Sequence, residues 1–130
     1  IAYLDQLHHF VIGGAQRVPA RVVVLGFSQG AATAARWVAA RKPTVNDVVL
    51  WGGSVPPEIP RGSETFGKAK LTLVFGSADR QTPAAWIQQE TAALNAAGLS
   101  HDVLLFDGGH EIAAEPLQRL ASRYSEDFGG

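Results

Sequence analysis

In this 130-residue chain, the residue whose sequence context best suits nucleophilic catalysis is a serine flanked by glycines. Ser28 stands at the centre of GFSQG, residues 26–30, after the apolar run RVVVL and before an alanine-rich stretch. A serine at the apex of such a strand-to-helix turn exposes its hydroxyl for attack on a carbonyl group. We expect the two glycines to remove side chains that would collide as strand and helix approach each other. The alternative is an ordinary turn in which Ser28 caps the helix.

Two further polar residues follow apolar strands later in the chain. Asp79 follows the run LTLVFG at residues 71–76, and His110 follows VLLF at residues 103–106 through a Gly-Gly turn. The carboxyl ends of parallel strands face one crevice, so Ser28, Asp79 and His110 can meet there. A serine activated by a histidine that an aspartate orients performs acyl transfer, and this chain order is that of the α/β-hydrolases.

Asp107 competes with Asp79 for the role of the acid, since it is closer in sequence to His110. It ends the strand that delivers His110, however, and would have to fold back on its own loop. Asp79 comes from the neighbouring strand and can reach across, so we favour Asp79. Taken singly, Asp79 could cap the helix that starts near Pro83, and His110 could be a solvated loop residue. Their order on three strand ends favours catalysis.

The elements that would position these residues alternate between strands and helices. Near-continuous apolar strands separated by helices predict an α/β fold with a parallel sheet covered on both faces. A proline-, glycine- and serine-rich segment, residues 53–68, is expected to form a long loop. The predicted elements are helix 2–12, strand 21–26, helix 29–41, strand 47–52, strand 70–75, helix 83–97, strand 102–106 and a helix from Ala113 to Tyr124.

Composition narrows the classes of function. A formal net charge of −1 leaves no basic surplus for nucleic acid, and 46% hydrophobic residues suit one globular unit over residues 1–130. No apolar run approaches the roughly 20 residues that span a bilayer. The chain has no cysteine, and its four histidines show no metal-ligand spacing, so we expect neither metal nor cofactor. No signal peptide is visible, and we expect a cytoplasmic protein.

The chain resembles the phospholipase/carboxylesterase family of α/β-hydrolases, which includes the acyl-protein thioesterases. The resemblance rests on GFSQG around Ser28, on Asp79 with the Thr-Pro pair that follows it, and on GGHEI around His110. It implies Ser28 as nucleophile, His110 as general base and Asp79 as the acid that orients the base. Ala31 and Thr82 depart from the family pattern without touching this triad. The resemblance also implies an α/β-hydrolase domain that is incomplete at its N-terminus, with about four strands and flanking helices.

The implied activity is hydrolysis of a carboxylic ester or thioester through an acyl-enzyme. The backbone N–H of Gln29 would be one oxyanion donor. A second donor would lie on a loop before the serine and has no candidate in the chain, so we expect a fragment. We also expect Trp51, Val55, Pro56 and Ile59, which follow a strand end, to line the acyl or alcohol pocket. Loop packing is the alternative for these four residues.

The strand at 21–26 would lie next to a strand that the chain lacks and would form an exposed apolar edge. Such an edge invites pairing with another chain, so a homodimer is one expected assembly. The expected partner is a small ester or thioester substrate, with no nucleic acid and no membrane span. The competing function is a non-catalytic, hydrolase-like module that binds a ligand or a protein partner.

Overall fold

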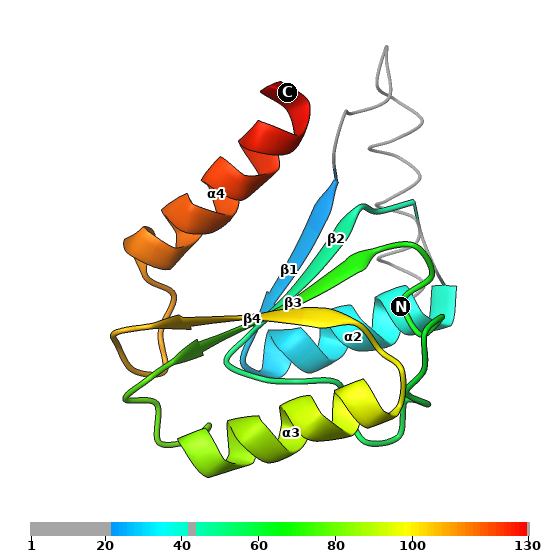
Figure 1. The fold of residues 1–130 in the computed structure, drawn as a ribbon, viewed down its shortest axis with the longest axis horizontal. Coiled ribbons are helices and arrows are strands. Elements are labelled where there is room, and N and C mark those ends of the chain that lie inside the picture. The colour runs from blue at the N-terminus through cyan, green and yellow to red at the C-terminus, as the bar shows by residue number, and fades with distance from the viewer. Residues whose placement is uncertain (1–21, 42–43, 130) are drawn as a thin grey trace.

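The described strands form a parallel sheet with helices on both faces (Figure 1). The computed structural model describes residues 22–41 and 44–129. The strand order is β1-β2-β3-β4, and each neighbouring pair is parallel, which confirms the predicted α/β class. The elements are β1 (Val23–Phe27), α2 (Gln29–Arg41), β2 (Asp47–Trp51), β3 (Lys70–Gly76), α3 (Ala84–Ala96), β4 (His101–Phe106) and α4 (Ala114–Gly129).

Two apolar layers hold the sheet between its helices. Leu50 of β2 packs in one cluster with the buried side of α2 and with Leu94 of α3. Trp51, the next residue, packs on the opposite face in a second cluster with Leu120 of α4. Successive strand residues point to opposite faces, so a strand covered on both sides is apolar throughout. This explains why every residue of β2 is buried and why its sequence shows no alternation.

The observed element ends differ most from the predicted ones at the last helix. The sequence predicted an end at Tyr124, whereas α4 continues to Gly129. Neither proline nor glycine occurs between these two residues, so no helix breaker stops the helix earlier. Helix α2 has the predicted bounds, and the other described elements differ from the prediction by one or two residues at their ends. The predicted helix 2–12 lies outside the described residues.

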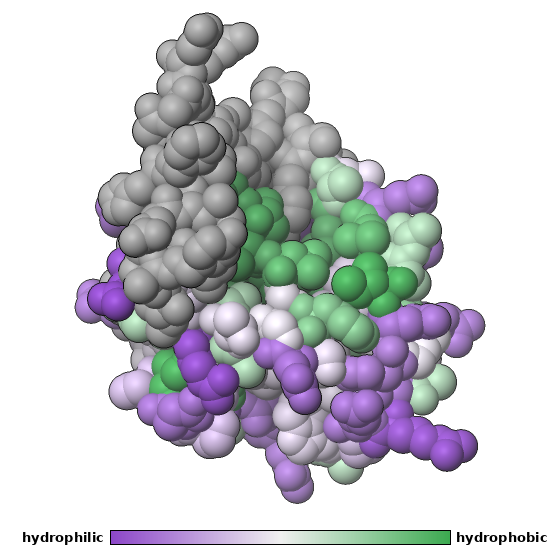
Figure 2. All heavy atoms as spheres, turned by 180° about the vertical axis from the view of Figure 1, so that it is seen from behind, coloured by the Kyte–Doolittle hydropathy of each residue, from purple (hydrophilic) through white to green (hydrophobic). Residues whose placement is uncertain are grey.

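β1 lies at one end of the described sheet, with β2 on its one paired side. Val23 and Leu25 of β1 are 37% and 39% exposed. Figure 2 shows the molecule from behind, and hydrophobic side chains gather near the centre of that face. Among the described residues β1 is therefore an apolar edge strand, at the position that the sequence predicted. Its pairing with a second copy of the chain stays a prediction.

Candidate active site

Ser28 occupies the sharp turn between β1 and α2, with a φ angle of 57°. This left-handed conformation is uncommon for a residue with a side chain and costs free energy, so surrounding contacts must hold it. The Ser28 N–H donates to the Trp51 carbonyl oxygen at 2.8 Å, and the Ser28 carbonyl oxygen accepts from the Ala31 N–H at 3.1 Å. These two bonds fix the turn on both sides of the serine.

The two glycines of the turn have different roles. A Cβ built on Gly26 would lie 2.6 Å from the Gly30 carbonyl carbon and 2.8 Å from the Ala31 Cα, so only glycine fits. A Cβ on Gly30 would meet no heavy atom within 4 Å. The expectation that both glycines remove a colliding side chain is therefore correct for Gly26 and wrong for Gly30. It is the backbone of Gly30, and not its missing side chain, that crowds Gly26.

A chain of hydrogen bonds joins the three predicted catalytic side chains. The His110 Nε2 lies 2.9 Å from the Ser28 Oγ, and the His110 Nδ1 lies 2.7 Å from the Asp79 Oδ2. Because a carboxylate only accepts, Nδ1 carries a proton that it donates to Asp79. In the neutral imidazole Nε2 is then the acceptor and receives the hydroxyl proton of Ser28. This tautomer is the one that a general base needs.

Asp79 is almost completely buried, with 4% of its surface exposed. Besides the bond from His110, its Oδ1 accepts the backbone N–H of Gln81 at 2.8 Å. Burial raises the pKa of Asp79, but the hydrogen bonds from His110 and Gln81 outweigh burial and lower the pKa below its usual value. Asp79 is thus an ionised carboxylate at neutral pH, held at one end by Gln81 and available at the other to His110.

The backbones after β3 and β4 approach each other closely at the site. A Cβ at Gly76 would lie 2.9 Å from the Gly108 carbonyl carbon, so a side chain there would meet backbone. The Ser77 N–H donates to the Phe106 carbonyl oxygen, and the Ala78 N–H donates to that of Gly108, each at 2.8 Å. The loop with the aspartate and the loop with the histidine are therefore joined through their main chains.

The His110 ring packs against Phe27 and Gly52. The ring centroids of Phe27 and His110 are 5.0 Å apart. Gly52 has a φ of +71°, and a Cβ built there would lie 3.0 Å from the His110 Cε1. A side chain at this position would press on the ring. Sequence reasoning missed Gly52, although a Gly-Gly pair directly after an apolar strand marks a close approach of backbone to a neighbour.

Asp107 and Gln29 occupy different surroundings. Asp107 is exposed, and the carboxylate that the structure brings to His110 is that of Asp79. Gln29 is the first residue of α2 and is also exposed. The N–H groups of a first helical turn have no acceptor within the helix, and the helix dipole favours negative charge there. The N–H of Gln29 is therefore suited to hold a developing oxyanion beside Ser28.

The four residues expected to line a substrate pocket have packing roles in the structure. Trp51, Val55, Pro56 and Ile59 are all buried. Val55 and Ile59 belong to the cluster beneath α2, and Trp51 belongs to the cluster beneath α4. Val55 and Ile59 are buried because the loop after β2 folds back over α2, where the Glu58 carboxylate accepts a hydrogen bond from Arg36 at 2.7 Å. Their role in substrate binding stays a prediction, and their burial does not support it.

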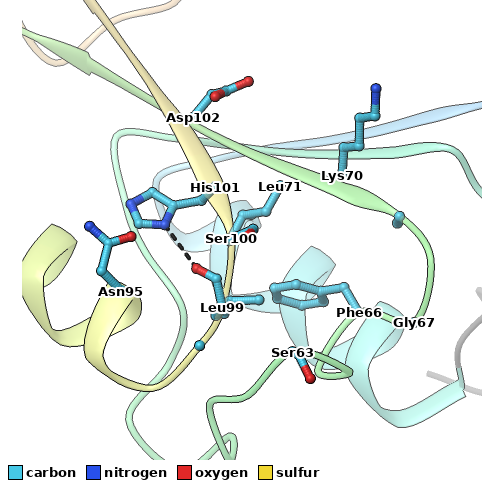
Figure 3. Close-up of a pocket in the computed structure, with 12 residues that line it drawn as sticks. Ser63, Phe66, Gly67, Lys70, Leu71, Asn95, Leu99, Ser100, His101 and Asp102 are labelled. Carbon is cyan, nitrogen blue, oxygen red and sulfur yellow. Dashed lines mark hydrogen bonds between the residues drawn. The ribbon is translucent and has the colours of Figure 1, made fainter.

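Other features of the described residues lie away from the three side chains. A cavity of about 520 Å³ is lined by residues such as Phe66, Lys70, Leu99 and His101 (Figure 3). It lies at the amino ends of β3 and β4, whereas Ser28 lies beyond the carboxyl end of β1. Within residues 22–41 and 44–129, no group of three or more histidines or carboxylates could hold a metal ion. None of the helices described there is long and apolar enough to cross a membrane.

Comparison of the sequence with models of protein families identifies the family of this chain. The model of the dienelactone hydrolase family matches residues 7–125, which is nearly the whole chain. This protein therefore belongs to the dienelactone hydrolase family. A search of curated proteins gives no match.

Solved structures show the same fold. A carboxylesterase from Bacillus cereus superposes with a TM-score of 0.68 at 16% identity, covering 96% of this chain and 58% of that one. Acyl-protein thioesterase 2 from Zea mays superposes with a TM-score of 0.63 at 22% identity, covering 95% of this chain and 64% of that one. A variant of SOBER1 from Arabidopsis thaliana superposes with a TM-score of 0.70 at 22% identity, covering 93% of this chain and 60% of that one. The α/β-hydrolase fold and the predicted resemblance are thus confirmed, and the chain spans less than two thirds of each of these structures.

Proposed function

We propose that this chain carries the Ser28–His110–Asp79 triad of a serine hydrolase that cleaves carboxylic esters or thioesters. The observation that carries the proposal is the continuous hydrogen-bonded chain from the Ser28 Oγ through His110 to Asp79, at 2.9 and 2.7 Å. Membership of a hydrolase family favours hydrolysis over a purely binding role. The order of the three residues along the chain, each after a different parallel strand, supports the same conclusion.

In the first half of the proposed reaction, the His110 Nε2 accepts the Ser28 hydroxyl proton as Oγ attacks the substrate carbonyl carbon. The Asp79 carboxylate stabilises the imidazolium through the Nδ1–H bond. The imidazolium then gives its proton to the leaving alcohol or thiol, and the acyl group stays on Oγ. In the second half, His110 takes a proton from water as the water oxygen attacks the acyl-enzyme, and it returns that proton to Oγ as the acid leaves.

The negative charge on the carbonyl oxygen needs donors that are in place before the reaction. The Gln29 N–H, at the start of α2, is the donor that we propose within the described residues. A hydrolase of this fold takes a second donor from a loop before the elbow, and we propose that residues 1–130 do not supply it. Loss of one such donor costs about 2.7–4 kcal/mol of transition-state stabilisation. Residues 1–130 alone should therefore be much less active than a protein that supplies it.

A fluorophosphonate probe tests the proposed nucleophile directly, because it forms a covalent bond with an activated serine. We expect one labelled peptide, the one that contains Ser28, and no labelling of Ser28→Ala. Ser63→Ala is the matched control, since Ser63 is an exposed serine of the loop after β2. Labelling that survives Ser28→Ala would refute the proposal. A folded full-length protein that neither reacts with the probe nor hydrolyses esters would instead favour the binding module.

The substrate type is tested with a chain-length series. We propose a carboxylesterase, a lysophospholipase or an acyl thioesterase, which differ in acyl length and in leaving group. Hydrolysis of p-nitrophenyl esters from acetate to palmitate separates short-chain from long-chain acyl groups. Acyl-coenzyme A thioesters and a lysophosphatidylcholine then separate the leaving groups. The preferred substrate is the one with the highest kcat/KM, since that ratio measures differential transition-state binding.

A further inference from the structure

Trp51 touches both halves of the proposed catalytic machinery. Its carbonyl oxygen accepts the N–H of Ser28, and its indole Nε1–H donates to the Glu111 carbonyl oxygen, each at 2.8 Å. Glu111 directly follows His110 in the chain. One residue at the end of β2 therefore connects the turn that holds the nucleophile to the loop that holds the base.

The indole is held in one orientation. Its side chain is almost fully enclosed, with 1% of the residue exposed, and its ring centroid lies 5.6 Å from that of Phe106. A buried indole N–H nearly always has a hydrogen-bond acceptor. The apolar side chains that pack around this ring offer no acceptor. The ring also fills the layer between β2 and α4. The direction of the N–H is therefore set by packing, and the loop of His110 must come to it.

The loop that carries His110 is hydrogen-bonded to neighbouring segments on both sides of the histidine, and within the loop the Glu111 N–H donates to the Gly109 carbonyl oxygen at 3.0 Å. It contains Gly108 and Gly109, which lose more conformational freedom on ordering than other residues do. Before His110, the Gly108 carbonyl oxygen accepts the Ala78 N–H at 2.8 Å. After His110, the Glu111 carbonyl oxygen accepts the Trp51 indole N–H at 2.8 Å. The two bonds flank the histidine, so loss of the second would free one side of the loop.

We propose that Trp51 is a positioning residue, whose indole N–H holds the loop at Glu111 so that His110 reaches Ser28 and Asp79 at the same time. This inference rests on the proposed serine hydrolase function. It replaces substrate contact as the role of Trp51, because a residue that is 1% exposed offers almost no surface to a substrate. The indole would act through the histidine loop, without touching the reacting atoms.

Trp51→Phe tests the proposal, because it keeps an aromatic ring and removes the donor. A displacement of about 1 Å in a catalytic group can lower a rate about 100-fold, and we expect kcat to fall between about tenfold and that limit. KM for a p-nitrophenyl ester should stay within about twofold, whereas loss of a substrate contact would raise KM. Trp86→Phe is the control: Trp86 lies on α3, edge-on to Phe75, and should leave kcat unchanged.

A spectroscopic measurement separates this proposal from the proposed activity. The proton between the His110 Nδ1 and Asp79 gives a downfield proton NMR signal. The signal is assigned by its disappearance in the Asp79→Asn variant. In Trp51→Phe this signal should shift or disappear through exchange, and in Trp86→Phe it should remain. The result does not depend on turnover. If neither the parent protein nor any variant hydrolyses esters, the proposed hydrolase function is refuted, while the NMR signal still tests whether Trp51 positions His110.

A second replacement keeps the test decisive if Trp51→Phe does not fold. The benzothiophene analogue of tryptophan at position 51 has nearly the same shape as indole and carries sulfur in place of N–H. It should reproduce the fall in kcat and the change in the Nδ1 proton signal with little change in the unfolding temperature. If the folded analogue protein keeps kcat within about twofold and keeps the signal unchanged, the proposal is overturned.

Discussion

Asp79→Asn exchanges one oxygen of the buried carboxylate for an amide, and the structure fixes which one. The Gln81 N–H donates to Oδ1 at 2.8 Å, so that position must remain an oxygen. The new NH₂ group then occupies the Oδ2 position, 2.7 Å from the His110 Nδ1. Two donors cannot face each other there, so His110 must give up its Nδ1 proton and carry a proton on Nε2 instead. An Nε2–H pointing at Ser28 cannot accept the hydroxyl proton.

We therefore expect Asp79→Asn to lower kcat by about 10⁴, the effect of the same exchange in a well-studied serine protease. At about 1.36 kcal/mol for each factor of ten, this equals about 5.4 kcal/mol of transition-state stabilisation. Steady-state hydrolysis of a p-nitrophenyl ester at saturating substrate measures it. Asp107→Asn is the matched control and should stay within about twofold, since Asp107 is exposed. A kcat for Asp79→Asn within tenfold of the parent, or a larger loss in Asp107→Asn, would refute this reasoning.

Three further predictions concern the fold around the site. Gly26→Ala should destabilise the protein by about 1–3 kcal/mol or more, because the new Cβ would press on the backbone of Gly30 and Ala31. Gly30→Ala in α2 should be neutral or should stabilise the protein by up to about 1 kcal/mol. Urea unfolding of the two variants measures the difference. The net lowering of the pKa of Asp79 means that its contribution to stability is present above its unfolded pKa of about 3.9 and is lost as the pH falls through the folded value. The stability difference between the parent and Asp79→Asn should therefore shrink below about pH 4 in unfolding experiments, and a constant difference would contradict the pKa argument. Residues 1–130 alone should dimerise through the β1 edge or be poorly soluble and inactive; a soluble monomer with full esterase activity, seen by size-exclusion chromatography and assay, would show that both the edge and the oxyanion arguments are wrong.

The sequence predicted the features that depend on neighbouring residues along the chain. Near-continuous apolar runs predicted buried parallel strands. The prediction succeeded because β2 and β3 are covered on both faces. The close contact at Gly26 followed from the turn itself. The choice of Asp79 over Asp107 could also be argued from strand order, since β3 and β4 are neighbours in the sheet.

Contacts between distant segments that do not follow from the order of the strands could not be predicted. Trp51 follows an apolar strand, and nothing near it in the sequence indicates that Glu111, on another loop, accepts its indole N–H. The burial of Val55 depends on how the loop after β2 folds back, which proline and glycine content does not specify. The contact between Gly52 and the His110 ring likewise needs three-dimensional placement.

The main-chain bonds between the loops after β3 and β4 have a consequence for how the site was assembled. The carboxylate and the imidazole are presented by two loops that are already joined, through Ala78 and Gly108, whether or not a hydroxyl faces them. Ser28 comes from a separate turn, which Trp51 links to the histidine loop, and its side chain meets this pair through one hydrogen bond to His110. The bonds that orient the base therefore do not depend on the Ser28 hydroxyl group. Exchange of the residue at position 28 would leave an oriented imidazole facing whatever thiol, hydroxyl or water molecule takes the place of the serine.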